Sequence, residues 1–395
     1  MSNAVIVSAV RTPVGKFQGA LSAFSATQLG AIAVREAIKR AHLDPASVDE
    51  CILGCVLTAG LGQNPTRQAA LRAGMPEISS SLTINQVCGS GLRAVALAAQ
   101  SILTGEAQIV VAGGMESMSN APYLLPHARK GLRMGDSAVV DSMVRDGLWC
   151  SCNDFHMGQT AELIADKHSI TREEQDAFAL ESHRRAAHAW NSGHFAAEVI
   201  PVDIPAAKKD APATTLLRDE SIREDASMQS LSALRPAFKK DGGTVTAGNA
   251  PGVNDAAAAL VVMSEEKARA LHLTPLATIR AHAISGVDPK WMGLAPVSGI
   301  EKLLTKTGWK QNEVDLYEMN EAFAVQALGV TRELELPLDK VNVNGGAVAI
   351  GHPIGASGAR ILVTLLHEMQ RRDVNRGIAA LCLGGGNAVA LAVER

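Results

Sequence analysis

The sequence has few aromatic residues and few cysteines. Phe, Trp and Tyr make up 3% of its 395 residues, and the six cysteines are unevenly spaced. Small secreted domains that depend on disulfides carry cysteine far more densely, so this chain shows no disulfide framework. The N-terminal segment also lacks the charged region, long apolar run and cleavage site of a signal peptide. We therefore expect a reducing, cytoplasmic location.

Long apolar runs and an excess of basic charge are also missing. No uninterrupted apolar stretch approaches the ~20 residues that a membrane-spanning helix needs. The formal net charge of −3 offers no basic surface for nucleic acid or an anionic membrane. We expect neither as a partner. With 47% hydrophobic and 19% charged residues, the chain is typical of a globular protein with a large core.

Metal-binding and nucleotide-binding motifs are absent as well. Cys51 and Cys55 are close in the sequence, as are Cys150 and Cys152, but no paired histidines or cysteines complete a tetrahedral zinc set. There is no Walker motif and no Gly-x-Gly-x-x-Gly at a strand-to-helix junction. We predict no metal site.

The feature that stands out is an internal repeat. Residues 88–93 (CGSGLR) precede a helix-like stretch and the buried strand-like segment 108–116; residues 352–360 (HPIGASGAR) precede a second such stretch and the segment 378–386. Each copy predicts a loop, a helix and a short buried strand that ends in glycines. Two copies predict two similar α/β halves packed together.

Cys88 and His352 begin the two copies. Each is expected where a strand gives way to a helix, which is where α/β folds build their clefts. A helix N-terminus would stabilise a Cys88 thiolate, and a histidine held between Gly351 and Pro353 suits a base. Two other candidates stay open at this point: Cys382 fits core packing on its strand, and Asn320 fits a satisfied buried polar group.

Between the halves lies a more polar region. A capping box opens a helix over 171–191, and prolines interrupt the segment that follows. We predict an N-terminal half over 1–119 and 244–272, an inserted loop-rich domain over 120–243, and a C-terminal half over 273–395. Buried strand character is expected to resume over 244–263.

Several widely spaced motifs, in order, resemble those of the thiolase family, and the match covers essentially the whole chain. They are the segments 85–91 (NQVCGSG), 113–119 (GGMESMS), 156–158 (HMG), 246–249 (TAGN), 320–323 (NEAF), 345–353 (GGAVAIGHP) and 382–386 (CLGGG).

The resemblance implies a two-step acyl transfer without metal or cofactor, in which coenzyme A is a substrate and product. Cys88 attacks a thioester after His352 takes its proton, and Cys382 removes a proton from the α-carbon of a second acyl-CoA. The family places one oxyanion hole at His352 and a water held by Asn320. It places a second at the backbone N–H groups of Cys88 and Gly384, which is reasonable because both steps build negative charge on a thioester oxygen.

The same resemblance implies acyl-CoA contacts in and near the inserted domain, and a homo-oligomer built as a dimer of dimers. It is closest to the short-chain, acetoacetyl-CoA type; the alternative is a broader 3-ketoacyl-CoA thiolase. A decarboxylating ketoacyl synthase and a catalytically inactive CoA-binding module are less favoured, because all four reactive residues are present.

Two positions depart from the family pattern, Pro251 for a serine and Ala295 for a glycine. The expected substrate-binding residues are His156, Met157, Arg223, Ala247, Met292 and Phe323.

Overall fold

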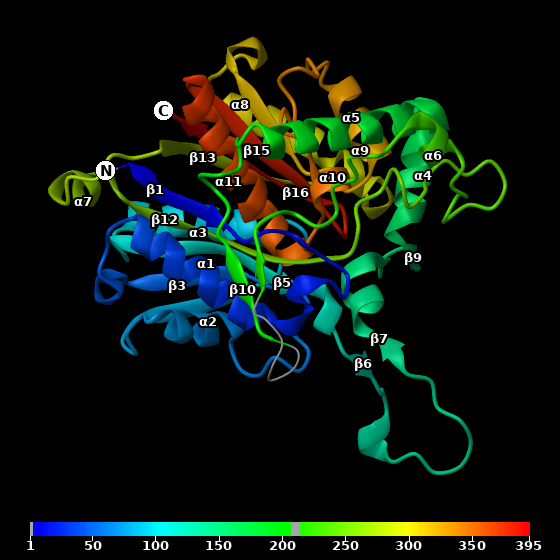
Figure 1. The fold of residues 1–395 in the computed structure, drawn as a ribbon, viewed down its shortest axis with the longest axis horizontal. Helices are drawn as coiled ribbons and strands as arrows, with labels where there is room; N and C mark the ends of the chain where they lie inside the picture. Colours follow the sequence, from blue (N-terminus) through cyan, green and yellow to red (C-terminus); the bar gives the residue numbers. More distant parts are fainter. Residues whose placement is uncertain (1–2, 207–213) are drawn as a thin grey trace.

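The computed structural model describes residues 3–206 and 214–395. Its main element is one mixed sheet that runs through both halves of the molecule (Figure 1). The N-terminal half contributes five strands and the C-terminal half four, and the short β2 (Gly15–Lys16) pairs with β12 at one side. In spatial order the nine are β4 (Ser80–Ile84), β3 (Glu50–Gly54), β5 (Ile109–Ser117), β12 (Asn254–Ser264), β1 (Ala4–Arg11), β13 (Ala277–Gly286), β16 (Asn387–Glu394), β15 (Arg376–Leu383) and β14 (Leu316–Met319).

The strand pairing repeats between the two halves. In the first, β3 and β5 are parallel, and β5, β12 and β1 are successively antiparallel. In the second, β14 and β15 are parallel, and β15, β16 and β13 are successively antiparallel. The halves join through a short antiparallel pairing of β1 with β13 at Val5–Thr278 and Ile6–Ala277. This duplication confirms the two similar α/β halves expected from the sequence.

Two helices form the centre of the molecule. α3 (Ser90–Thr104) and α11 (Ile354–Arg372) share one hydrophobic core with strands from both halves. Their backbones approach so closely that two contact positions have no room for a side chain. A Cβ on Gly91 would lie 2.7 Å from the backbone N of Ala359, and one on Gly358 would lie 2.4 Å from the backbone N of Leu92. Within the described residues, Val87–Thr104 is the one stretch long and apolar enough to cross a membrane, and 61% of it is buried. Its position between the halves accounts for its apolar composition.

Further helices cover the outer faces of the sheet. α1 (Ala26–Arg40) and α2 (Pro65–Ala73) pack on the N-terminal half, and α1 starts at a Ser25–Gln28 capping box. α8 (Ala295–Thr307), α9 (Ala324–Glu333) and α4 (Met157–His168) cover the C-terminal half. The shorter α7 (Glu265–Ala270) and α10 (Ala347–Ile350) connect larger elements. The chain therefore forms alternating layers, with α3 and α11 buried in the middle.

The region between the halves consists of helices, short hairpins and loops. α5 (Arg172–Asn191) begins at Thr171, and its capping box with Glu174 is present as predicted. The expectation that strand structure resumes at residue 244 is wrong by ten residues, because β12 starts at Asn254 and 244–253 is a loop. The remaining elements are β6 (Tyr123–Leu124), β7 (Val140–Asp141), β8 (Trp149–Cys150), β9 (Phe155–His156), β10 (Val202–Ile204), β11 (Thr214–Leu216) and α6 (Met228–Ser232).

A buried ion-pair network holds this region against the first half. Arg11, at the end of β1, is fully buried; its Nε donates to Glu198 at 2.6 Å and its Nη1 to Asp219 at 2.7 Å. Asp219 also accepts from the backbone N of Val14 and from Trp190 Nε1. Because Arg11 and both carboxylates are buried, removing Arg11 would leave two buried carboxylates without their cation, at a cost of about 3–5 kcal/mol.

Candidate active site

One apolar cavity of about 230 Å³ brings both halves and the intervening region together. The N-terminal half contributes Cys88 and the C-terminal half contributes His352 and Gly384. Apolar side chains form most of the remaining wall, as is usual for small-molecule sites. They include Val87, Met118, Leu148, Met157, Phe238, Ala250, Pro251, Val253, Met292, Ala322, Phe323 and Ile354.

Cys88 lies on a tight turn between β4 and α3. The preceding Val87 has φ +48°, a rare value for a β-branched residue. Asn85 stabilises this conformation by accepting from the backbone N of Val87 at 3.0 Å. The Ser90 hydroxyl accepts from the backbone N of Gln86 at 2.8 Å and donates to the carbonyl of Val87 at 2.7 Å. The turn therefore holds the Cys88 thiol, which is partly exposed, at the cavity wall.

Burial dominates the electrostatics of Cys88. Burial raises the pKa of the Cys88 thiol to about 11, although the backbone N–H groups of Gly384 and Cys88 itself act to lower it. Stabilisation of the Cys88 thiolate by a helix N-terminus stays a prediction: α3 begins at Ser90, two residues after Cys88, and burial has the larger effect on the thiol pKa. Cys88 is a neutral thiol at rest, and it requires a base to become nucleophilic.

His352 has the tautomer that such a base needs. Ser357 Oγ donates its hydrogen to the carbonyl of Pro353 at 2.9 Å, so it accepts from His352 Nδ1 at 2.6 Å. Nδ1 therefore carries the ring hydrogen, and Nε2 keeps its lone pair. Asn320 Nδ2 lies 3.4 Å from that Nε2, and the buried Asn320 Oδ1 has no partner in the described residues. Burial, with a smaller contribution from the Arg360 charge, lowers the pKa of His352 to about 3.

The surroundings of His352 also correct one sequence expectation. The segment before Cys88 is the strand β4, but the segment before His352 contains only an isolated bridge between Tyr317 and Val341, followed by α10. The His352 backbone is held instead by Asn254, whose Oδ1 accepts from the backbone N of His352 at 2.9 Å. The strand that begins at Asn254 thus positions the base from the other half of the repeat.

The low pKa of His352 predicts acid sensitivity. An unfolded histidine titrates near pH 6.5, so below that pH the unfolded chain binds a proton that folded His352 excludes. This contribution to stability is complete above about pH 6.5 and is lost as the pH falls toward about 3. At about pH 5 the loss amounts to roughly 2 kcal/mol. Urea unfolding should be measured at about pH 7.5 and at about pH 5. Between these two pH values, the free energy of unfolding should fall less for His352→Asn than for the wild type. Equal losses would contradict a neutral, buried His352.

Cys382 and Gly384 approach the same place from β15. Gly384 lines the cavity, whereas Cys382 is buried immediately beside it and pairs with Ala388 on β16. Burial and the nearby Cys88 both raise the pKa of the Cys382 thiol. The Gly89 backbone packs so closely on this strand end that a Cβ there would lie 2.7 Å from a methyl of Leu383. The two thiols are therefore electrostatic neighbours, although only Cys88 lines the cavity.

Four of the six predicted substrate-binding residues line the cavity: His156, Met157, Met292 and Phe323. His156 accepts from the backbone N of Gly158 through Nδ1 and stacks on Phe238, with ring centroids 4.7 Å apart. The other two do not line it. Ala247 is exposed on the loop before Ala250, and Arg223 is exposed on the segment that follows β11.

The sequence interpretation missed two residues that organise the site. Ser357 sets the tautomer of His352, and its alignment with Ser90 in the repeat was a usable signal. Glu116 is fully buried and accepts from the backbone N of Val56, Leu57 and Gly355 at 2.8–3.1 Å. Through these hydrogen bonds, Glu116 connects the end of β5 and the loop after β3 with the first turn of α11. Burial raises the pKa of Glu116 to about 7.

Metal ligands are not assembled near this cavity or elsewhere in residues 3–206 and 214–395. No group of three or more His, Cys, Asp or Glu side chains in these ranges is placed to hold an ion. Cys51 is buried on β3, and Cys55 approaches Glu116 with its Sγ 3.7 Å from Oε1.

A thiol and an unprotonated imidazole nitrogen, brought from two halves of a duplicated α/β fold into one apolar cavity, define a thiolase-like class of enzyme. The family description "Thiolase, N-terminal domain" matches residues 4–266, and "Thiolase, C-terminal domain" matches residues 273–395. The chain belongs to the thiolase family.

Full-length relatives carry a consistent description. The chain is 56% identical over 395 residues to the acetyl-CoA acetyltransferase of Cupriavidus necator, with all of both chains covered. It is 54% identical over 396 residues to the acetyl-CoA acetyltransferase of Escherichia coli, again with all of both covered. The crystal structure of the Bacillus anthracis acetyl-CoA acetyltransferase superposes with a TM-score of 0.97 at 45% identity, covering 100% of this chain and 99% of that one.

Proposed function

We propose that this enzyme is an acetyl-CoA C-acetyltransferase, which joins two acetyl-CoA molecules into acetoacetyl-CoA and CoA and catalyses the reverse thiolysis. The observation that carries this proposal is the placement of Cys88, His352 and Gly384 around a single small apolar cavity, with Asn320 and Cys382 directly behind it. The relatives described as acetyl-CoA acetyltransferases support the same substrate.

The first half-reaction transfers an acetyl group to Cys88. His352 Nε2 takes the thiol proton as the sulfur attacks the thioester carbonyl, and the C–S bond to CoA then breaks. The departing CoA thiolate takes the proton from His352. Because His352 and Cys88 are both neutral at rest, proton transfer is coupled to attack, and no charged pair has to be maintained in the apolar cavity.

The second half-reaction forms the carbon–carbon bond. His352 Nε2, neutral again, takes the proton of the Cys382 thiol. The Cys382 thiolate then removes a proton from the α-carbon of a second acetyl-CoA, and the resulting carbanion attacks the acetyl-Cys88 carbonyl. The bond to Cys88 sulfur breaks, and the Cys88 thiolate recovers its proton from His352, while Cys382 keeps the proton taken from the substrate. Backbone N–H groups of Cys88 and Gly384 stabilise the oxyanion on the acyl group. His352, which is protonated on Nε2 at this stage, and a water held by Asn320 stabilise the enolate oxygen of the second substrate.

Two methionines predict a preference for short acyl chains. Met157 and Met292 are 8% and 4% exposed and wall the cavity, so added methylenes meet filled space. Such overpacking costs roughly 1–3 kcal/mol, or about one to two orders of magnitude in rate. We expect thiolysis of acetoacetyl-CoA to exceed that of an eight-carbon ketoacyl-CoA by at least this factor in kcat/KM. Met292→Ala should narrow the difference.

Met75→Ala is the matched control, because Met75 is equally buried but lies in the separate core beneath α1 and α2. It should leave the ratio of the two kcat/KM values unchanged. Comparable kcat/KM for the four-carbon and eight-carbon substrates in the wild type would contradict the short-chain assignment and favour a broader 3-ketoacyl-CoA thiolase.

The intervening region, 120–243, is the proposed binding surface for the rest of CoA. His156 and Phe238 place a stacked pair of rings at the cavity wall, and the neutral His156 keeps Nε2 as a donor for the CoA arm. Arg223 and Ala247 lie outside the cavity and could contact only the more distant parts of CoA. Pro251 stands in the wall without a hydroxyl, so this enzyme makes one hydrogen bond fewer there.

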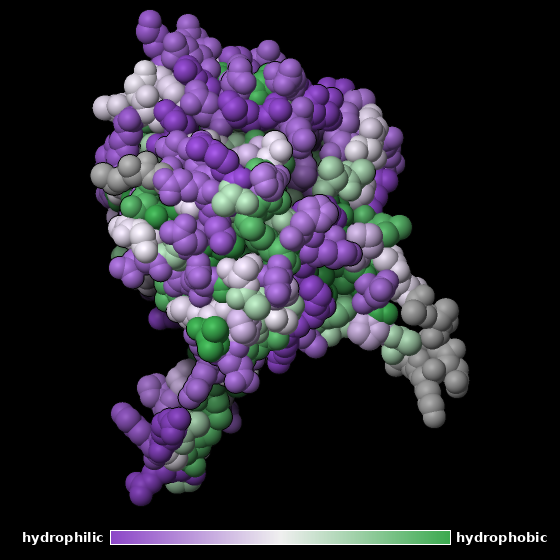
Figure 2. Space-filling model, turned by 90° about the vertical axis from the view of Figure 1, so that its left-hand side faces the viewer, coloured by the Kyte–Doolittle hydropathy of each residue, from purple (hydrophilic) through white to green (hydrophobic). Residues whose placement is uncertain are grey.

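We further propose a homo-oligomer in a reducing cytoplasm. The arm between β6 and β7 extends away from the body in both views and carries hydrophobic residues on its surface (Figures 1 and 2). Tyr123, Leu132, Met134 and Val139 on this arm are 54–99% exposed. β4 is one of the two edge strands of the sheet, and no strand in residues 3–206 and 214–395 pairs with its outer side. An arm and an open edge give two surfaces, which is the number that a dimer of dimers requires.

A further inference from the structure

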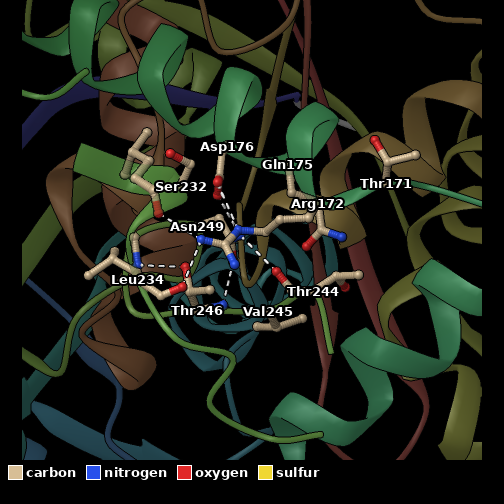
Figure 3. A network of polar contacts seen from close by, with 12 residues as sticks. Thr171, Arg172, Gln175, Asp176, Ser232, Leu234, Thr244, Val245, Thr246 and Asn249 are labelled. Atoms are coloured by element: carbon tan, nitrogen blue, oxygen red, sulfur yellow. Dashed lines mark hydrogen bonds and ion pairs between the residues drawn. The ribbon is translucent and has the colours of Figure 1, made fainter. Parts of the chain in front are cut away.

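A buried carboxylate outside the cavity organises one of its walls. Asp176, on α5, is 1% exposed, and both of its oxygens are used (Figure 3). Oδ1 accepts from Asn249 Nδ2 at 2.9 Å, and Oδ2 accepts from Arg172 Nε at 2.7 Å. Arg172 also donates to the carbonyls of Leu231 and Leu234 at 2.6 and 3.0 Å. Asp176 thus links α5, the α6 region and the loop that contains Asn249.

Asn249 uses its polar groups in one fixed arrangement. Its Oδ1 accepts from the backbone N of Thr246 at 2.8 Å, and its Nδ2 donates to the carbonyl of Thr244 at 3.1 Å as well as to Asp176. Its own carbonyl accepts from the backbone N of Ala324 at 2.9 Å. Because Asn249 is fully buried, this arrangement has no competition from solvent.

The residues that follow Asn249 in the chain, and a residue next to its hydrogen-bond partner Ala324, line the cavity. Residues 250–253, which follow it, all line the wall, and the next residue, Asn254, holds the His352 backbone. Ala324 begins α9, and the residue before it, Phe323, also lines the wall. A shift of Asn249 would therefore move both the 250–253 wall and the Phe323 wall.

We propose that Asp176 is a positioning residue for acyl-CoA binding, which fixes the 250–253 and Phe323 walls through its hydrogen bond to Asn249. It touches neither the substrate nor the reacting atoms. The proposal rests on the proposed function, because the cavity walls are assigned to acyl-CoA. It separates binding from chemistry, because Asn254, which holds the His352 backbone, is fixed independently of Asn249: its Nδ2 donates to the carbonyl of Gly15 at 2.9 Å and to Ser221 at 3.0 Å.

The test is Asp176→Asn, which replaces one carboxylate oxygen by an NH₂ group that must face either Asn249 Nδ2 or Arg172 Nε, both donors. We expect KM for acetoacetyl-CoA in thiolysis to rise about tenfold, with kcat changed less than about threefold. The rate at which iodoacetamide alkylates Cys88, followed by peptide mass, should remain at the wild-type value. A purely structural defect would change alkylation and kcat together with KM.

Asp166→Asn is the matched control. Asp166 is also a helical aspartate paired with a cation, Lys239, but its side chain is 62% exposed, so KM should not change. Asn249→Ser provides a second variant, because it removes the same hydrogen bond while Asp176 keeps Arg172 and no buried charge is orphaned. It should also raise KM.

An unchanged KM in either folded variant, or a fall in kcat and alkylation rate as large as the rise in KM, would overturn the role of Asp176. A wild-type enzyme that cleaves no acetoacetyl-CoA would instead contradict the proposed function. The two failures are therefore distinguishable.

Discussion

Replacement of Cys88 by serine is expected to eliminate acyl transfer in both directions, by roughly a thousandfold or more. Cys88 lies on the strained turn at the cavity wall, facing the half of the fold that supplies His352. A neutral imidazole can take the proton of a thiol, but a serine hydroxyl is far harder to ionise, and its alkoxide gains little from the same surroundings. After incubation with acetyl-CoA, intact-mass analysis should find one acetyl group on the wild type and none on Cys88→Ser.

Cys152→Ser serves as the control for this experiment. Cys152 is an exposed free cysteine, so its loss should leave the acetyl group in place. Acetylation of Cys88→Ser to the wild-type extent would show that another residue is the nucleophile.

Cys382→Ala should separate the two half-reactions. Because Cys382 is buried behind the wall and is not part of the Cys88–His352 arrangement, the variant should still acquire an acetyl group from acetyl-CoA. It should lose the exchange of acetyl-CoA α-protons into deuterated water, together with condensation, by at least about a hundredfold, the scale of losing a general base. NMR of acetyl-CoA in deuterated buffer measures the exchange, and intact mass measures acetylation.

Cys51→Ala is the matched substitution, since Cys51 is likewise a buried cysteine on a strand, in the other half. It should retain exchange at the wild-type rate, which controls for loss of packing. Undiminished exchange in Cys382→Ala would assign proton removal to a different group.

The predicted features that the structure confirms depend on neighbouring residues in the chain. The capping box at Thr171 and Glu174 closes within one helical turn, so its residues alone determine where α5 begins. The duplicated halves follow from two similar stretches of sequence, each of which makes its own loop, helix and strand. The glycines at 89 and 91 lie at the start of the first copy, and residues of the second copy pack against them: Leu383 on Gly89 and Ala359 on Gly91.

The features that sequence analysis missed or misjudged depend on residues far apart in the chain. Glu116 contacts Gly355 across 239 positions, and Asp176 contacts Asn249 across 73. The sequence contains Glu116 and Asp176, but it does not indicate which distant residues they contact. The pKa of the Cys88 thiol likewise depends on packing, because burial raises it.

By itself, the sequence determined the thiolase family and the duplicated α/β architecture, and it predicted which residues react. Local sequence patterns carry this information, so no knowledge of packing is needed to read it. Only the tertiary structure decided which of those residues share the cavity, the tautomer that Ser357 imposes on His352, and the exclusion of Arg223 and Ala247 from the wall. The physical reason is that protonation, burial and wall position are set by neighbours in space, and at this site those neighbours come from both halves of the chain and from the region between them.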